Sequence, residues 1–288
     1  MVANVRSRQL ENSPRPIQST YCFNSFACQA TYKPMTRSIS QHCTLSSIPI
    51  MLRSHLTVLE SSAARYPSSP VFKIPQLDSQ GSIECWEPIT YQRFRGDVES
   101  YARYWTSVFK RDHIPQRSVI GIWYVNARIA AIRSRLIQIF RVSGFTYTDV
   151  LHIYGISRAG YIPQLFSLRL PNPEVIYELL HRANARALVH AQTFESVLHG
   201  SPVPIYSDVV DASASDDSRV MLPQFSSTQG NDIAFIFHTS GSTSGSPKLV
   251  PCSYRWLHSV VDKSNQVSVP RNPRRQDVTV MMFVNSCS

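Results

Sequence analysis

The sequence predicts an α/β protein in which layers of parallel strands are flanked by helices on both faces. From about residue 50 onward, short apolar runs of strand length alternate with longer segments whose apolar residues recur at three- and four-residue spacing. Parallel strands need long crossover connections, and helices usually supply them. This alternation therefore indicates a layered parallel sheet rather than an all-helical or all-β protein.

The first long helix is expected after Thr90, whose hydroxyl can cap it. The apolar side chains that share one face of this helix are Phe94, Val98, Ala102, Trp105 and Phe109. We expect Trp105 to pack in the core rather than to bind a ligand. Val119 to Trp123 is then a short buried strand.

The next elements are separated by glycine and proline. Gly160 ends a helix, because glycine favours the left-handed conformation that follows many helices. Tyr161 to Leu168 is predicted as a buried strand. Pro173 opens the next helix (Glu174 to Ala183), since proline is tolerated in the first helical turn. Ala187 to His190 is the strand after it.

A loop rich in glycine and hydroxyl groups follows the apolar strand Ile233 to Phe237 and leads into a second short strand at Pro247-Lys248-Leu249-Val250-Pro251. Glycines at 241 and 245 allow successive backbone N–H groups to point into one concavity. The hydroxyls and Lys248 add donors and one positive charge. The loop is therefore expected to hold a polyphosphate. A flexible Gly/Ser linker is the alternative, and the tight strands on both sides argue against it.

The Walker pattern is absent, because Gly245 is followed by serine and proline. The loop instead resembles the phosphate-binding signature of the adenylate-forming (AMP-binding) superfamily, which includes acyl-CoA synthetases and the adenylation domains of nonribosomal peptide synthetases. The family pattern is roughly T-S-G-[ST]-T-G-x-P-K-G. The matching residues are Thr239, Ser240, Gly241, Ser242, Thr243, Gly245, Pro247 and Lys248. Ser244 is one extra residue in the loop, and Leu249 replaces the last glycine; both departures resemble a fungal synthetase-like version.

The resemblance also covers Ile153 to Ala191 and extends over roughly residues 50–123 and 144–283. It implies the incomplete N-terminal large subdomain of an adenylate-forming enzyme. In such enzymes ATP and a carboxylic acid give an acyl-adenylate and pyrophosphate, and a thiol of CoA or of a phosphopantetheine carrier then accepts the acyl group. The implied cofactors are ATP and Mg²⁺, and a carrier-protein domain is a candidate partner.

By the same resemblance, Lys248 has the catalytic role and residues 239–245 (Thr239, Ser240, Gly241, Ser242, Thr243, Ser244, Gly245) bind the ATP phosphates. No protein metal ligand is expected. The motifs that the family places after this loop do not occur in the 288 residues. We therefore expect the chain alone to be inactive, and the sequence does not identify the carboxylic acid.

Two other functions stay open. One is an inactive remnant that at most binds nucleotide. The other is a basic RNA-associated protein in which the Gly/Ser loop is a linker. His238, which directly precedes the loop, is either a structural histidine or a residue that approaches the substrate.

The formal net charge is +10, and most of the excess lies in residues 1–49 and 124–143. No basic face interleaved with aromatic residues emerges, so we expect no nucleic-acid binding. Arg158 and Arg169 are interpreted as ordinary surface charges. No apolar run approaches the roughly 20 residues that a membrane-spanning helix needs, so no membrane span is expected.

The 6 cysteines include no C-x-x-C pair and show no zinc-ligand spacing, which favours reduced intracellular thiols. We expect a cytoplasmic protein. Residues 1–49 are rich in Ser, Thr and Arg and nearly free of acid, as in a mitochondrial transit peptide, but prolines interrupt any sustained helix. This segment is interpreted as a disordered tail or as misassigned translated sequence.

Residues 50–288 are interpreted as a partial AMP-binding domain. Within it, residues 124–143 carry only positive charge and interrupt the family pattern. They are either a helical insertion or a translated, retained intron.

Overall fold

The structure is a computed structural model that describes residues 52–78, 82–123, 146–166, 170, 172–212, 219–224, 229–239 and 247–267. The predicted tail (1–49) and the predicted insertion (124–143) lie outside these residues. The helices are α1 (His55–Arg65), α2 (Tyr91–Arg111), α4 (Tyr147–Arg158), α5 (Pro173–Arg182), the 3₁₀ helix η1 (Gln192–Val197) and α6 (Tyr254–Val267). The strands are β1 (Pro70–Leu77), β2 (Ile83–Thr90), β3 (Val119–Trp123), β4 (Ile162–Leu165), β5 (Ala185–His190), β6 (Ile205–Ser207), β7 (Ile233–His238) and β8 (Leu249–Ser253).

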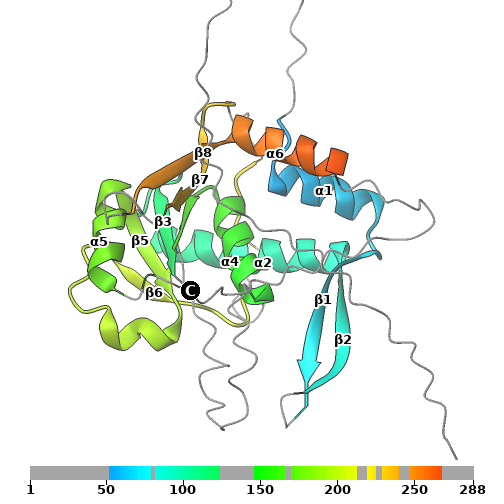
Figure 1. The fold of residues 1–288 in the computed structure, drawn as a ribbon, viewed down its shortest axis with the longest axis horizontal. Helices are drawn as coiled ribbons and strands as arrows, with labels where there is room; N and C mark the ends of the chain where they lie inside the picture. The colour runs from blue at the N-terminus through cyan, green and yellow to red at the C-terminus, as the bar shows by residue number, and fades with distance from the viewer. Residues whose placement is uncertain are drawn as a thin grey trace, which may run out of the picture. The chain divides into compact units, whose positions relative to one another are not determined.

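Six strands form one sheet in the order β6-β5-β3-β4-β7-β8, and all neighbours are parallel except β7 and β8. The predicted parallel α/β fold is therefore confirmed (Figure 1). Two antiparallel pairs add to it. β8 returns directly from β7 without a crossover, which requires an antiparallel pairing. β1 and β2 form a separate two-stranded antiparallel hairpin.

Helices cover both faces of the sheet, as the alternation of side chains along its strands requires. Ile120 and Ile122 of β3 pack in a buried cluster with side chains of α2 and α4. Trp123 of β3 and Leu188 of β5 pack in a second cluster with side chains of α5. The central strands are thus buried on both faces, as is typical of parallel sheets.

Helices α2 and α4 form the closest helix pair on the first face (Figure 1). The Thr90 hydroxyl accepts a hydrogen bond from the Arg93 amide at 3.2 Å, which confirms the predicted cap. Trp105 is fully buried and stacks on Phe109 with ring centroids 4.9 Å apart, so its predicted core role is also confirmed. Gly155 of α4 lies where an added Cβ would be 2.7 Å from the Tyr101 Cβ.

A buried histidine links this helix pair to a loop. His152 is fully buried, and its Nδ1 accepts a hydrogen bond from the Trp105 indole N–H at 3.1 Å. Its Nε2 then carries the proton and donates to the Val209 carbonyl at 3.0 Å. Burial lowers the pKa of His152 to about 3, so the ring is neutral at physiological pH.

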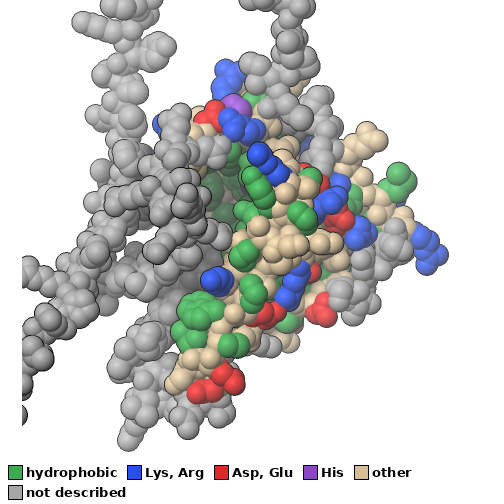
Figure 2. All heavy atoms as spheres, turned by 90° about the vertical axis from the view of Figure 1, so that its right-hand side faces the viewer, with side chains coloured by type: hydrophobic (Ala, Val, Ile, Leu, Met, Phe, Trp, Pro, Cys, Tyr) green, Lys and Arg blue, Asp and Glu red, His purple; other side chains and the backbone are tan. Residues whose placement is uncertain are grey.

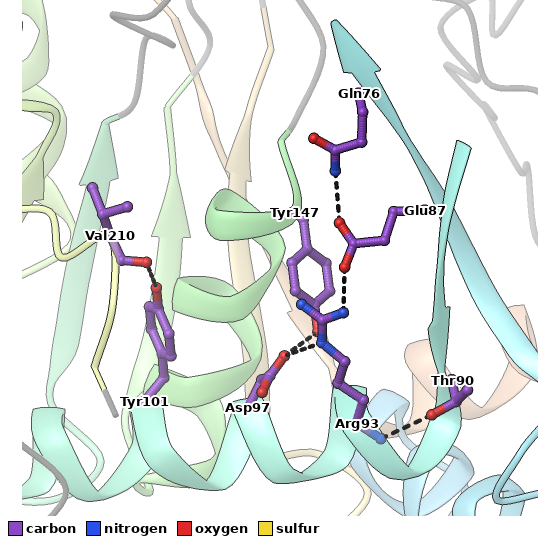
Figure 3. A network of polar contacts seen from close by, with 8 residues as sticks. All are labelled: Gln76, Glu87, Thr90, Arg93, Asp97, Tyr101, Tyr147 and Val210. Atoms are coloured by element: carbon purple, nitrogen blue, oxygen red, sulfur yellow. Dashed lines mark hydrogen bonds and ion pairs between the residues drawn. The ribbon is translucent and has the colours of Figure 1, made fainter. Parts of the chain in front are cut away.

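A polar network joins the hairpin to the helix pair (Figure 3). Arg93 of α2 forms ion pairs with Glu87 of β2 and with Asp97 one turn along the helix. The Tyr147 hydroxyl of α4 donates to Asp97 at 2.7 Å. Gln76 of β1 donates to Glu87 at 2.6 Å. Both strands and both helices therefore meet in one set of contacts.

Most predicted boundaries agree with the structure. Gly160 has φ of 88° after α4, and Asn172 caps α5 with Pro173 at its start. β4 is shorter than the predicted strand Tyr161–Leu168; the last two residues of that range lie outside the described part, as does Arg169.

The interpretation of Arg158 as an ordinary surface charge was wrong. Its side chain is half-buried, and its Nη1 donates to the Pro223 carbonyl at 2.6 Å. The side chain thus joins the end of α4 to a loop far along the chain, a contact that the local sequence does not reveal. Burial lowers the pKa of this guanidinium.

Figure 2 shows basic and acidic side chains interspersed on the face that it draws. Partly exposed ion pairs join Arg95 to Glu60 and Arg93 to Glu87. In the part of the chain that the structure describes, no helix has the length and hydropathy to cross a membrane.

Candidate functional site

The candidate site lies where β7 and β8 meet the loop between them. Ala234, Phe235 and Ile236 are buried, whereas the end of β7 becomes half-buried at Phe237 and His238. The antiparallel register pairs His238 with Leu249. The two strands thus carry the ends of the predicted phosphate loop to one place at the margin of the sheet.

Two of the predicted site residues, Thr239 and Lys248, face each other where the loop joins β7 and β8, and we call this place the neck. The Thr239 amide donates to the Lys248 carbonyl at 2.9 Å. The Lys248 amide donates to the Thr239 hydroxyl at 3.4 Å. Both residues are exposed. The structure therefore brings the two ends of the loop together and leaves the Lys248 ammonium accessible to a ligand.

The other predicted phosphate-binding residues lie outside the described residues. They are Ser240, Gly241, Ser242, Thr243, Ser244 and Gly245. Their roles stay predictions that rest on the motif.

His238 lies against the interior beside the neck. Its ring stacks on Phe166, at the end of β4, with ring centroids 6.2 Å apart and an interplanar angle of 29°. Its Nδ1 lies 3.5 Å from the Thr239 carbonyl oxygen. Burial lowers the pKa of His238, so the neutral ring is favoured. These contacts support the structural role that the sequence left open, while the ring remains adjacent to the neck.

Arg182 is a residue of this region that the sequence did not single out. It occupies the last turn of α5, and its Nη1 donates to the Pro247 carbonyl at 2.9 Å. Basic residues are common in last helical turns, because they complement the helix dipole. The position of Arg182 in the helix therefore did not indicate a further contact. The local sequence could not reveal it either, because Arg182 and Pro247 are 65 positions apart.

The described donors at the neck suit a phosphate ligand. A lysine ammonium supplies three N–H donors and a full charge, and a threonine hydroxyl supplies one more donor. Among the described residues, no group of three or more His, Cys, Asp or Glu side chains could hold a metal ion. Mg²⁺ binds phosphate oxygens and retains several waters, so it can reach such a site together with a nucleotide.

Known proteins resemble this chain in sequence and in fold. No family model matches the chain. A curated relative, the AMP-binding domain-containing enzyme iboA of Amanita muscaria (strain Koide BX008), is 27% identical over 210 residues. The match covers 71% of this chain and 37% of that protein. The chain thus corresponds to well under half of the relative's length.

Solved structures show the same fold. The nonribosomal peptide synthetase FmoA3 (S1046A) aligns with a TM-score of 0.52 at 15% identity, over 77% of this chain and 19% of that chain. The o-succinylbenzoate CoA synthetase MenE of Bacillus subtilis aligns with a TM-score of 0.50 at 13% identity, over 74% of this chain and 36% of that chain. The predicted resemblance is therefore confirmed: in sequence and in fold, this chain is similar to part of the adenylate-forming enzymes.

Proposed function

We propose that the protein uses ATP to activate a carboxylic acid as an acyl-adenylate, which then passes to a thiol of CoA or of a phosphopantetheine carrier. The observation that carries the proposal is the neck between β7 and β8, where Thr239 and Lys248 hold the two ends of a loop with the family's phosphate-binding motif. The curated relative is named as an AMP-binding enzyme, which supports the nucleotide part. Because the chain spans only 37% of that relative, the acid and the thiol acceptor belong to the proposal.

In this proposal the loop and Lys248 act on the phosphates. When a carboxylate oxygen attacks the α-phosphorus of ATP, the bond to the bridging oxygen breaks and negative charge develops on the departing pyrophosphate. Prearranged N–H groups, hydroxyls and the Lys248 ammonium would stabilise that charge. Mg²⁺ would neutralise part of the phosphate charge when bound with the nucleotide. We further propose that the protein acts in the cytoplasm.

Titration of the 288-residue chain with Mg·ATP, followed by calorimetry, tests the phosphate role. Lys248→Ala removes one charge-assisted contact, worth roughly 1.5–3 kcal/mol, so we expect ATP affinity to fall about ten- to a hundredfold. Lys263→Ala, which removes an exposed lysine on α6, is the matched control and should bind ATP like the unaltered chain. The proposal is wrong if the unaltered chain binds no ATP, or if both lysine variants bind it equally well.

In a longer protein that also carries the remaining length of the relatives, Lys248→Ala should slow acid-dependent pyrophosphate exchange. The ranking of carboxylic acids should stay the same, because the loop contacts the phosphates and not the acid. A changed ranking with unaltered ATP dependence would make the loop a wall of the acid pocket instead.

A further inference from the structure

We propose that Arg182 is a positioning residue that fixes the exit of the phosphate loop and thereby orients Lys248. The inference rests on the proposed function, because it assigns Arg182 to the same site. Its starting point is the hydrogen bond from the Arg182 Nη1 to the carbonyl of Pro247, 2.9 Å long. Pro247 is buried and directly precedes Lys248. The Arg182 guanidinium therefore holds the peptide group that joins Pro247 to Lys248.

This bond adds to the few hydrogen bonds that the described residues form across the neck. Among the residues that the structure describes here, the two ends of the loop are joined by the register pair His238–Leu249 and by the two hydrogen bonds between Thr239 and Lys248. One of these, from the Lys248 amide to the Thr239 hydroxyl, is 3.4 Å long and so is weak. A hydrogen bond from a guanidinium is charge-assisted and stronger than a neutral one. The Arg182 contact is thus well placed to limit the movement of the Lys248 backbone.

The arginine itself extends from a rigid support. Ile176, Leu179 and Leu180 of α5 are fully buried against the sheet. The side-chain amide of Gln164 on β4 donates to the Leu179 carbonyl at 3.0 Å, which ties the end of α5 to the central sheet. The hydrogen bond from Arg182 can restrain Pro247 only if α5 itself is held in place, and these contacts hold α5 against the sheet.

Glu178, one turn earlier on α5, contacts the same guanidinium at 3.5 Å. Both side chains of this ion pair are partly exposed, with 39% of the Arg182 and 53% of the Glu178 side-chain surface accessible. Exposed ion pairs of this kind contribute little. Glu178 therefore offers a control: its removal breaks an Arg182 contact without removing the contact to Pro247.

Hydrogen exchange of the ligand-free 288-residue chain tests the positioning role directly. Arg182→Ala and the milder Arg182→Gln should speed exchange of the Thr239 amide roughly three- to tenfold, the loss expected from one net hydrogen bond. The Ala191 amide, which donates to the Trp123 carbonyl at 3.1 Å, should exchange as before. Glu178→Gln should leave both amides unchanged, and Arg182→Lys should restore part of the protection.

The same variants are then titrated with Mg·ATP. We expect Arg182→Ala to weaken ATP binding roughly three- to tenfold, and Arg182→Lys to recover part of the affinity. Unchanged Thr239 exchange in both Arg182→Ala and Arg182→Gln would overturn the positioning role, as would equal acceleration at Thr239 and Ala191, which marks a general loss of stability. If Arg182→Ala speeds exchange of the Thr239 amide but the unaltered chain binds no ATP, the hydrogen bond from Arg182 to Pro247 is a structural contact and the proposed function is wrong.

Discussion

The α2–α4 face of the sheet and the β7–β8 margin differ in how far their side chains are buried. On the first face, Trp105 stacks on Phe109 and donates to His152, which donates onward to Val209. At the margin, β8 is exposed at Val250 and Pro251, and the neck depends on a few hydrogen bonds. The comparison teaches that the interior of the sheet supplies stability, while the margin leaves polar groups accessible for binding.

The largest expected effect is on stability, and it comes from replacing a buried and an exposed tryptophan by alanine. Trp105→Ala should lower the free energy of unfolding by about 3–5 kcal/mol, because it removes a fully buried ring and leaves His152 Nδ1 without that donor. Trp256→Ala on α6, where the ring is 46% exposed, should cost less than about 1 kcal/mol. Urea denaturation of both variants measures the difference, and similar losses would contradict the contrast.

Two histidines whose ring nitrogens are buried extend the comparison to the dependence of stability on pH. His55 of α1 packs between Tyr154 and Phe235, and neither buried ring nitrogen has a hydrogen-bond partner. Burial lowers the pKa of His55 to about 3, as it does for His152. The unfolded chain therefore takes up protons first, so stability is fully present above about pH 6.5 and is lost as the pH falls toward about 3.

His55→Leu should reduce this acid loss by about 2–3 kcal/mol between pH 6.5 and pH 4.5, since one of the two groups no longer titrates. At pH 7 the variant should be at least as stable as the unaltered chain, because the two nitrogens without partners are gone. His152→Leu should also reduce the acid loss but should destabilise the chain at pH 7, since the Trp105 indole N–H loses its acceptor. Urea titrations at several pH values would disprove the assignment if His55→Leu kept the full acid dependence.

Two helical glycines provide the smallest contrast. Gly155→Ala on α4 should destabilise the fold by about 1–3 kcal/mol, because the new methyl group would lie 2.7 Å from the Tyr101 Cβ and 3.2 Å from the Tyr101 carbonyl carbon. Gly96→Ala on α2 meets no atom within 4 Å and should stabilise by about 0.5–1 kcal/mol through helix propensity. Thermal melts should show a lower melting temperature for Gly155→Ala and a higher one for Gly96→Ala. Equal shifts in melting temperature would contradict the close approach of α2 and α4.

The sequence by itself determined the local elements and predicted the chemistry of the loop. Thr90 capped α2, Gly160 ended α4, and the apolar positions of α2 became its buried face, because caps, turns and periodicity act over a few residues. The motif with Lys248 indicated a resemblance to the adenylate-forming enzymes, because glycines, hydroxyls and a lysine in one loop are suited to binding phosphate.

Only the tertiary structure decided which distant residues meet. The contacts of Arg182 with Pro247 and of Arg158 with Pro223 each join residues 65 positions apart. The burial of His55 between two rings of other elements follows from packing rather than from its neighbours in sequence. A single sequence carries the periodicity of each element but not its partner, because the free energy that selects partners comes from burial and hydrogen bonding across the assembled sheet.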